Sequence, residues 1–228
     1  MKKGSKLFIA GASNLVGKNL VKEALSAGYE VTAWSTDLDK MHDIKKGKQK
    51  FKIIEANMTD TDAFIKATEN HRFLVSTFDG EHRSEEKRSQ KPRAQVTKLI
   101  VEAAKRNSIE KVIVMLGASL LRQHEEGGKL HDKEDIPDFM KDLAEDLKEA
   151  YAILKESNIN WTGICPPTVT NLAATGRHEE FEDYLMGDAH QVSVTVGDLV
   201  EFILEELKND DHKKKLVGIT TYTPVASS

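Results

Sequence analysis

Near its start the chain reads LFIAGASNLVG from Leu7 to Gly17. The first four residues form an apolar run, typical of a strand that is buried on both faces. From Leu15 to Ala27 the apolar side chains recur at helical spacing, and Gly28 follows as a helix-terminating glycine. A short glycine-containing turn therefore joins a buried strand directly to a helix.

The chemistry of this turn indicates a site for a pyrophosphate group. Gly11 permits a tight exit from the strand, and Gly17 lets the helix pack close to the sheet. A helix that begins near Leu15 directs unpaired backbone N–H groups and the positive end of its dipole at the space above the turn. The candidate cofactor-binding residues here are Gly11, Ser13, Asn14, Leu15, Val16 and Gly17, with Ser13 as a helix cap or a phosphate ligand. The alternative is an ordinary glycine turn.

Strand-like and helix-like segments alternate along the rest of the chain. Strands are predicted at 31–34, 51–54, 73–76, 112–116, 161–165 and 216–220, and helices at 59–67, 94–106, 136–155 and 200–207. Parallel neighbouring strands need crossover connections, so this alternation predicts an α/β fold with a mostly parallel sheet and helices on both faces. A length of 228 residues suits one domain spanning 1–228.

Composition excludes several classes of function. Hydrophobic residues make up 39% of the chain, enough for a core, and no apolar run approaches the roughly 20 residues that span a bilayer. The net charge of −4 gives no general attraction to nucleic acid. The basic start precedes too short an apolar stretch for a signal peptide, and the single cysteine, Cys165, suits a reducing compartment. We expect a cytoplasmic protein without a membrane or nucleic-acid partner; the oligomeric state stays open.

Two polar segments interrupt the alternation, at residues 79–93 and 122–134. Both follow predicted strands. Loops at the carboxyl ends of parallel strands surround the ligand crevice of such folds. They are therefore either part of that crevice or solvated surface loops, and their role stays open.

Several segments together resemble a known family. They are GASNLVG at 11–17, GYEVTA at 28–33, IEANMTD at 54–60, VMLGASL at 114–120, LKESNINWT at 154–162 with the following Pro166-Pro167, and VTVGDLV at 194–200. The chain resembles the atypical short-chain dehydrogenase/reductases over nearly its whole length. Within them it is most similar to the NmrA-like, NADH-flavin-reductase-like and biliverdin-reductase-B-like proteins.

The resemblance implies a Rossmann-like, doubly wound NAD(P)-binding domain, with residues from about 166 to 228 completing a small substrate-side region. It also implies further cofactor contacts after the third, fourth and sixth strands. These are Asn57 and Met58, then Ser76, Thr77 and Phe78, then Pro166. The chain departs from the family pattern at Asn14, where a second glycine is usual, and at Asn57, where aspartate is common. Asparagine tolerates positive φ better than most residues, so the turn is expected to survive the first change.

The end of the second strand bears on the choice between NAD and NADP. An arginine that pairs with the 2′-phosphate of NADP is frequent there in the family, whereas this chain has Thr36 and Asp37. A carboxylate accepts hydrogen bonds from a ribose diol and repels a phosphate. Thr36 and Asp37 therefore favour NAD, although Lys18 and Lys40 leave NADP open.

No proton-relay group stands where the resemblance places one. The family's catalytic tyrosine and lysine would fall near Leu143 and Leu147. Tyr151 and Lys155 have the Tyr-x-x-x-Lys spacing but lie two turns later, where packing against the sheet is the alternative to a catalytic role. Gly117 replaces the usual serine after the fifth strand. Ser119, two residues further on, is a second weak candidate, or simply a turn residue. The histidines lack the close spacing of metal ligands, so no metal site is expected.

Three functions remain in competition. The first is an NAD(P)H-dependent oxidoreductase that transfers hydride to a flavin, a quinone or a similar planar acceptor, because such transfer needs mainly orientation and exclusion of water. The second is a non-catalytic NAD(P)-binding redox sensor of the NmrA-like kind. The third is a sugar-nucleotide epimerase or dehydratase, for which the chain is short and lacks the required tyrosine. Whether the protein is an enzyme is left open by the sequence.

Overall fold

A computed structural model describes residues 4–35, 37, 39–41, 44, 50–55, 60–80, 91–128, 138–186 and 191–221. Three predicted cofactor residues, Thr36, Asn57 and Met58, lie outside these ranges, as do residues 81–90 and 129–134 of the two polar segments.

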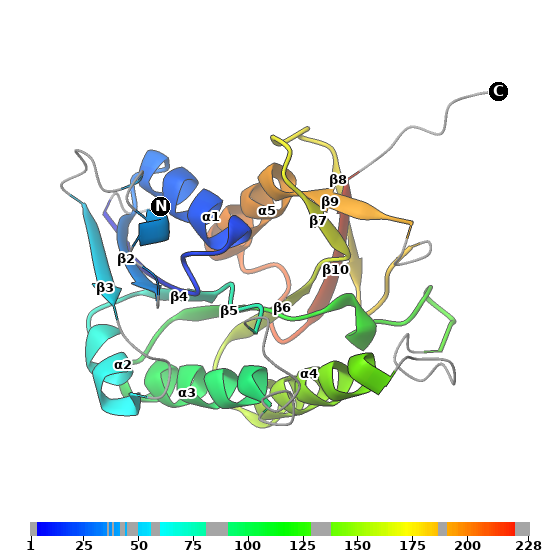
Figure 1. Ribbon diagram of the computed structural model, residues 1–228, viewed down its shortest axis with the longest axis horizontal. Coiled ribbons are helices and arrows are strands. Elements are labelled where there is room, and N and C mark those ends of the chain that lie inside the picture. The colour runs from blue at the N-terminus through cyan, green and yellow to red at the C-terminus, as the bar shows by residue number, and fades with distance from the viewer. Residues whose placement is uncertain are drawn as a thin grey trace.

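The described elements alternate between strands and helices through most of the chain (Figure 1). The strands are β1 (Lys6–Ala10), β2 (Glu30–Ser35), β3 (Phe51–Glu55), β4 (Phe73–Ser76), β5 (Lys111–Met115), β6 (Trp161–Cys165), β7 (Thr168–Thr170), β8 (His178–Glu182), β9 (Ser193–Thr195) and β10 (Leu216–Thr221). The helices are α1 (Leu15–Ser26), α2 (Thr61–Ala67), α3 (Pro92–Arg106), α4 (Asp138–Glu156) and α5 (Val196–Asn209), with short 3-10 turns η1 (Asp39–Met41) and η3 (Ala118–Leu120).

Eight strands form the main sheet in the order β3-β2-β1-β4-β5-β6-β10-β8. Every pairing in it is parallel except that of β10 with β8, while β7 and β9 pair separately. The strand order reverses between β1 and β4, and ligands of such sheets bind outside the carboxyl ends of the strands at that reversal. The predicted α/β, doubly wound fold in a single domain is confirmed, and the ligand crevice is expected beyond Ala10 and Ser76.

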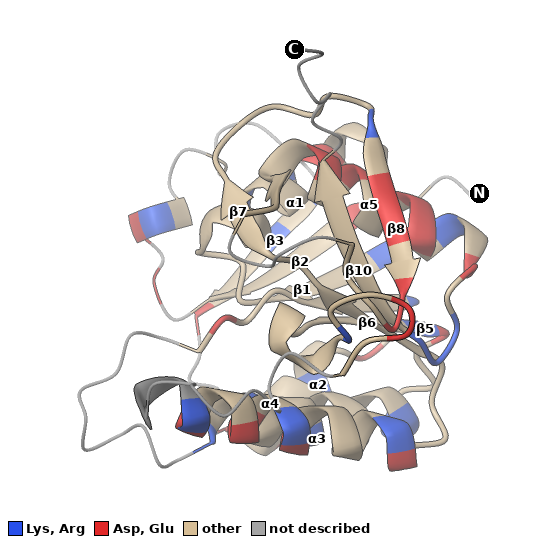
Figure 2. Cartoon of the chain, turned by 90° about the vertical axis from the view of Figure 1, so that its right-hand side faces the viewer, with Lys and Arg blue, Asp and Glu red and all other residues tan. Residues whose placement is uncertain are grey.

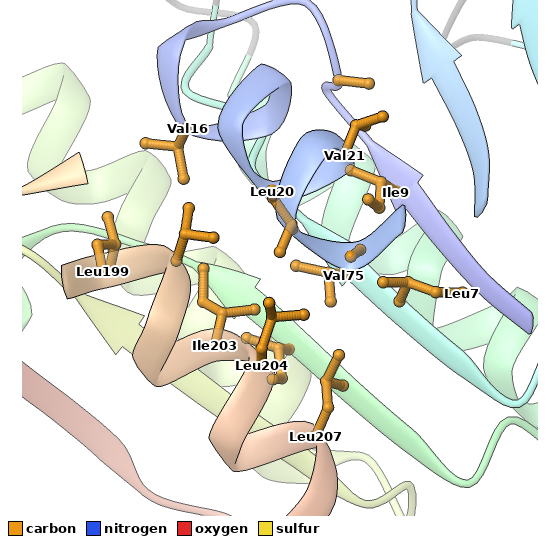
Figure 3. Close-up of a cluster of buried hydrophobic side chains, with 14 of the residues drawn as sticks. Leu7, Ile9, Val16, Leu20, Val21, Val75, Leu199, Ile203, Leu204 and Leu207 are labelled. Carbon is orange, nitrogen blue, oxygen red and sulfur yellow. The ribbon is translucent and has the colours of Figure 1, made fainter. Parts of the chain in front are cut away.

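Helices α1 and α5 cover one face of the sheet (Figures 1 and 3). Figure 3 shows Val16 and Leu20 of α1 facing Leu199 and Ile203 of α5, and Val75 of β4 belongs to the same cluster. All five side chains are nearly or fully buried. This core fixes the start of α1 over the carboxyl end of β1, where the glycine turn lies.

Helices α2, α3 and α4 cover the other face. The carboxylate of Asp146 on α4 accepts hydrogen bonds from the backbone N–H groups of Arg93 and Ala94, at 3.1 and 2.9 Å. The N-cap residue of α3, Lys91, makes no capping bond with its own side chain. Helix α4 thus supplies the cap that α3 lacks and holds the two helices in register.

The structure corrects the sequence prediction in a few places. Strands β7, β8 and β9 were not predicted, because β7 and β9 are three residues long and β8 reads HEEFE. Helix α3 begins at Pro92 and not at residue 94, so the last two residues of the polar segment 79–93 belong to the helix. Helix α2 begins at Thr61 and not at residue 59, because its N-cap is Asp60, whose carboxylate accepts from the N–H of Ala63.

Candidate functional site: the turn between β1 and α1

Both glycines of the turn are required by close backbone contacts. Gly11 has a φ of +80°, and a Cβ atom there would lie 2.8 Å from the backbone nitrogen of Phe78. A Cβ atom on Gly17 would lie 2.4 Å from the carbonyl oxygen of Gly11. The neighbouring atoms are backbone atoms, which cannot swing aside as a side chain can. The turn is therefore pressed against α1 on one side and the exit of β4 on the other.

Asn14 closes the turn. It is the N-cap of α1, with a φ of −81°, and its Oδ1 atom accepts from the N–H of Gly17 at 2.8 Å. Its Nδ2 atom donates to the carbonyl oxygen of Thr77 at 2.5 Å. The positive φ in the turn is taken up by Gly11, so Asn14 does not need the tolerance of positive φ that asparagine offers. Of the two roles predicted for Ser13, the helix cap is taken by Asn14, and the role of phosphate ligand stays a prediction.

The first turn of α1 keeps donors for an anion. Within the described part of the chain, the backbone N–H groups of Leu15 and Val16 have no hydrogen-bond acceptor. They stand at the positive end of the helix dipole, and no acidic residue lies in that turn. Unpaired donors beside a glycine cradle that a Cβ would fill suit the pyrophosphate of a dinucleotide. One donor of the usual set, the N–H of Gly17, is already occupied by Asn14.

The end of β2 carries a carboxylate that is held in place. The backbone N–H of Asp37 donates to the hydroxyl of Ser35, and the hydroxyl of Ser35 donates to the carbonyl of Asp37, both at 3.0 Å. Lys40 forms an ion pair with the carboxylate at 2.9 Å. The hydrogen bond from Lys40 lowers the pKa of Asp37 below its ordinary value. A partly exposed, ionised carboxylate thus follows the strand that neighbours β1.

The exit of β4 is tied to the glycine turn. The buried hydroxyl of Thr77 donates to the carbonyl of Gly11 at 2.9 Å, and the N–H of Phe78 donates to the hydroxyl of Ser76 at 3.4 Å. The structure therefore brings Ser76, Thr77 and Phe78 next to the predicted phosphate loop. The side chains of Ser76 and Thr77 make bonds within the protein, which leaves contacts with a cofactor to the backbone and to Phe78.

The carboxyl ends of β5 and β6 hold the remaining candidates. Ser119 lies in η3 just after β5, and Pro166 is buried just after β6, the neighbouring strand. A Cβ atom on Gly117 would lie 2.8 Å from a methyl carbon of Leu147. Leu147 is buried, whereas Leu143 is 37% exposed. Packing therefore fills the place that the resemblance assigned to a lysine.

Tyr151 packs in the core layer between α4 and the sheet. Its ring meets that of Trp161 edge to face, with the centroids 6.1 Å apart. Burial, with a smaller contribution from Asp183, raises the pKa of Tyr151, the opposite of what a proton donor at neutral pH needs. Burial also raises the pKa of Cys165, which keeps it a neutral thiol. Neither residue offers activated chemistry.

His178, Asp198 and Glu201 present ligand atoms within 4.8 Å of one another. Both carboxylate oxygens of Asp198 are already occupied. Oδ1 accepts from the N–H groups of Thr175 and Gly176, and Oδ2 accepts from the hydroxyls of Thr175 and Thr221. Burial opposes the charge of Asp198, but these bonds outweigh it and lower its pKa. Asp198 of α5 thus connects that helix to β10 and to the segment before β8 through hydrogen bonds. The expectation that the protein has no metal site stays a prediction.

The arginine beside the exit of β4 was missed by the sequence analysis. Arg93 lies 3.6 Å from the carboxylate of Asp146 and donates from Nη2 to the carbonyl of Asp79. A Cβ atom on Gly80 would collide with the guanidinium group. Burial lowers the pKa of Arg93, although Asp146 and Asp79 oppose that shift. Arg93 is 14 residues from Asp79 and 53 residues from Asp146 in the sequence, so no local sequence pattern indicates these contacts.

Comparisons with known proteins agree with this geometry. The model of the NAD(P)H-binding family matches residues 11–210. A protein from Streptococcus pneumoniae described as a candidate NADH-flavin reductase superposes with a TM-score of 0.78 and 20% identity, over 96% of this chain and 100% of that chain. A wide-type short-chain dehydrogenase/reductase from Veillonella parvula, solved with NADP, superposes with a TM-score of 0.73 and 18% identity, over 96% of this chain and 97% of that chain.

A third solved structure, a candidate epimerase from Bacteroides thetaiotaomicron, gives a TM-score of 0.81 at 23% identity, over 98% of this chain and 100% of that chain.

Among the described helices none is both long and apolar enough to cross a membrane. The family match extends from the glycine turn through α5. This chain therefore belongs to the NAD(P)H-binding family, with NAD or NADP as its cofactor.

Proposed function

We propose that the protein is an NAD(P)H-dependent oxidoreductase that passes hydride to a flavin, a quinone or a similar planar acceptor. The observation that carries this proposal is the β1–α1 turn, where the unpaired N–H groups of Leu15 and Val16 stand beside a glycine cradle. The bound nicotinamide supplies the hydride. The residues of the chain hold the dinucleotide, orient it and exclude water.

The choice of acceptor follows from the proton chemistry of the site. Tyr151 is packed against Trp161, and Leu147 fills the space beneath Gly117. Among the described residues at this end of the sheet, no tyrosine–lysine pair is arranged to deliver a proton. Reduction of a ketone needs such a donor, whereas a conjugated acceptor takes its proton from solvent after hydride arrives. Planar conjugated acceptors are therefore favoured over ketones and sugar nucleotides.

The test is a titration followed by an acceptor screen. The purified protein is titrated with NADH and NADPH by nicotinamide fluorescence, and oxidation at 340 nm is then followed with free flavins, quinones and simple ketones. We expect saturable binding of at least one cofactor, turnover with planar acceptors and none with ketones. Turnover confined to ketones or sugar nucleotides would refute the acceptor class.

We further propose that NADH is preferred over NADPH. The ionised carboxylate of Asp37 is held by Ser35 and Lys40, and a carboxylate accepts from ribose hydroxyls and repels a 2′-phosphate. Replacement Asp37→Asn is expected to lower the ratio of NADH to NADPH affinity about tenfold, a change of about 1.4 kcal/mol. Lys40→Gln is the matched control, because it removes the neighbouring positive charge and should raise that ratio.

The second candidate function is a non-catalytic sensor of the NAD(P) pool. It is favoured by Asn14, whose amide already occupies the Gly17 N–H and thereby weakens the anion site. Specific cofactor binding with no NAD(P)H oxidation by any flavin or quinone would support the sensor. Turnover that is lost in the same variants that lose cofactor binding would support the reductase.

A further inference from the structure

A groove of about 490 Å³ lies at the opposite ends of the strands from the cofactor turn. It is lined by the starts of β1, β2 and β3, by the end of α2 and by the segment that follows α2. Figure 1 places α2 below β3. The carboxyl ends of these strands face the cofactor, whereas the groove opens at their amino ends. It is therefore separate from the site described above.

Four lysines line this groove: Lys6, Lys50, Lys52 and Lys66. Within the described residues none of them forms an ion pair or a side-chain hydrogen bond. Two carboxylates, Glu30 and Glu69, also line the groove, so positive charge exceeds negative charge there. The chain as a whole carries a net charge of −4. An unpaired basic cluster on an acidic protein is a local feature with its own attraction for anions.

An imidazole lies at the inner wall of the groove. The ring of His71 packs edge to face on Phe8, with the centroids 5.4 Å apart. Its Nδ1 atom lies 3.1 Å from the carbonyl oxygen of Glu69 and its Nε2 atom lies 2.8 Å from the hydroxyl of Thr32. Because a carbonyl only accepts, Nδ1 carries the proton in this arrangement and Nε2 accepts from Thr32.

The ring is held without a charge in this setting. Burial lowers the pKa of His71, and the positive charges of Lys6 and Lys52 lower it further, against backbone hydrogen bonds that raise it. The groups that face the ring are thus two ammonium groups, a phenyl ring, a hydroxyl and backbone carbonyls. An anion between the lysines would remove the repulsion and supply the missing counter-charge.

We propose that this groove binds the phosphate chain of an oligophosphate, a di- or triphosphate group that is either free or carried by a nucleotide. The volume suits a ligand of that size. A single phosphate reaches only one or two of the ammonium groups, whereas successive phosphates meet several of them at once. Lysine binds phosphate oxygens as a mobile point charge, so no rigid pocket is needed.

The test uses tripolyphosphate and ATP on the intact protein at an ionic strength of about 0.15 M, where weak surface attraction is screened. Binding is measured by calorimetry, and the imidazole signals of His71 are followed by NMR after assignment with His71→Gln. We expect a His71 signal that shifts toward the protonated form as the anion binds in the groove. Binding confined to the β1–α1 turn, which also suits phosphates, leaves that signal unmoved and counts against the proposal. When the affinities are read from the His71 signal, equal affinity for the two ligands points to the phosphate chain alone, and tighter binding of ATP points to a nucleotide.

Matched variants separate this groove from general charge. Lys6→Gln/Lys52→Gln should weaken binding at least tenfold, about 1.4 kcal/mol. Lys22→Gln/Lys98→Gln changes the net charge by the same amount on exposed helix positions and should leave binding unchanged. The proposal is overturned by a His71 signal that does not move, by equal losses in both double variants, or by equal binding of a polyglutamate peptide. None of these readouts requires nicotinamide cofactor, so failure here leaves the oxidoreductase proposal standing.

Discussion

The side-chain amide of Asn14 joins the glycine turn to the carbonyl of Thr77, 63 residues further along the chain, across 2.5 Å. The same amide caps α1 through the N–H of Gly17. One side chain therefore stabilises two loops that border the cofactor site, and it does so by using a donor that would otherwise face the phosphates. Asn14 is therefore expected to raise the stability of the fold and to lower its affinity for the cofactor.

Replacing Asn14 with glycine should separate these two effects. The variant loses the bond to Thr77 and most of the cap, so we expect the free energy of unfolding to fall by about 1 kcal/mol. The Gly17 N–H becomes free to meet a phosphate, so affinity for the reduced cofactor should hold or increase. Urea unfolding and fluorescence titration measure the two quantities. A large loss of cofactor affinity would contradict this account of Asn14.

Asn14→Asp is the informative companion. The carboxylate keeps an acceptor for the Gly17 N–H but cannot donate to Thr77, and it adds negative charge beside the phosphate site. We expect weaker cofactor binding than in Asn14→Gly and a cofactor affinity that improves as salt screens the added charge. If both variants bind equally, Asn14 lies too far from the phosphates to matter.

Gly17→Ala should destabilise the fold although alanine is the better helix former. The added Cβ would lie 2.4 Å from the oxygen of Gly11 and 2.7 Å from the Cα of Ala12, so backbone must move. Overpacking of this kind costs about 1–3 kcal/mol, more than the gain of roughly 0.5–1 kcal/mol from helix propensity. Gly128→Ala, with no atom within 4 Å of the added methyl group, is the control. Stabilisation by Gly17→Ala would show that α1 does not pack as described.

Asp146→Asn tests the cap that α4 provides to α3. Asp146 is 2% exposed, and its carboxylate accepts hydrogen bonds from two backbone N–H groups. The Arg93 guanidinium lies 3.6 Å from the same carboxylate. Removing its charge leaves a largely buried cation without its partner, so we expect a loss of about 3 kcal/mol in chemical unfolding. Lys91→Gln breaks only an exposed ion pair with Glu149 and should cost less than about 1 kcal/mol. Similar losses in the two variants would refute this role for Asp146.

The parts that the sequence predicted are those whose signals are local. The apolar run before Gly11 and the helical spacing after Leu15 specify β1, α1 and the turn between them, because burial on both faces of a sheet leaves a continuous apolar strand. The family resemblance added the exit of β4, which the structure places against that turn through Thr77.

The parts that escaped prediction depend on long-range contacts or on exposed edges. The sequence of β8, with its glutamates, has no apolar alternation because it is the edge strand, where charges discourage pairing with other chains (Figure 2). The partnership of Asp146 with Arg93 joins residues 53 apart. The sequence offered Ser13 as a cap of α1 or a phosphate ligand, because serine and asparagine are both good N-caps, and the bond from Asn14 to the distant Thr77 is not visible in a local pattern.

A buried ionic network lies between the start of β5 and the C-terminal part of α5, and its strength depends on pH. The ammonium of Lys111 lies 2.6 Å from Glu206, and both residues are almost fully buried. The Nδ1 atom of His212 lies 2.9 Å from the second oxygen of Glu206, and Lys111 also pairs with Asp210. Burial opposes the charge of Glu206, but the bonds from His212, Lys111 and Thr162 outweigh it and lower its pKa to about 2.

His212 titrates in the opposite sense. The hydrogen bond to Glu206 raises its pKa above the ordinary 6.5, against burial, with further help from Glu180 and Glu182. A raised pKa contributes stability that is complete below pH 6.5 and is lost as the pH rises through the folded value. The lowered pKa of Glu206 contributes stability above its ordinary 4.5 that is lost as the pH falls toward 2. The network therefore stabilises the fold most between about pH 4.5 and 6.5.

Replacing His212 with glutamine should flatten the alkaline side of this profile. In the wild-type protein the free energy of unfolding should fall above pH 6.5 with a limiting slope of about 1.4 kcal/mol per pH unit from this group. The variant retains a hydrogen-bonding side chain but no titration, so its decline there should be shallower by that amount. Glu206→Gln, by contrast, leaves Lys111 with only the partly exposed Asp210 and should cost about 3–5 kcal/mol at neutral pH. Parallel pH profiles in wild type and His212→Gln would mean that His212 does not hold its proton through Glu206.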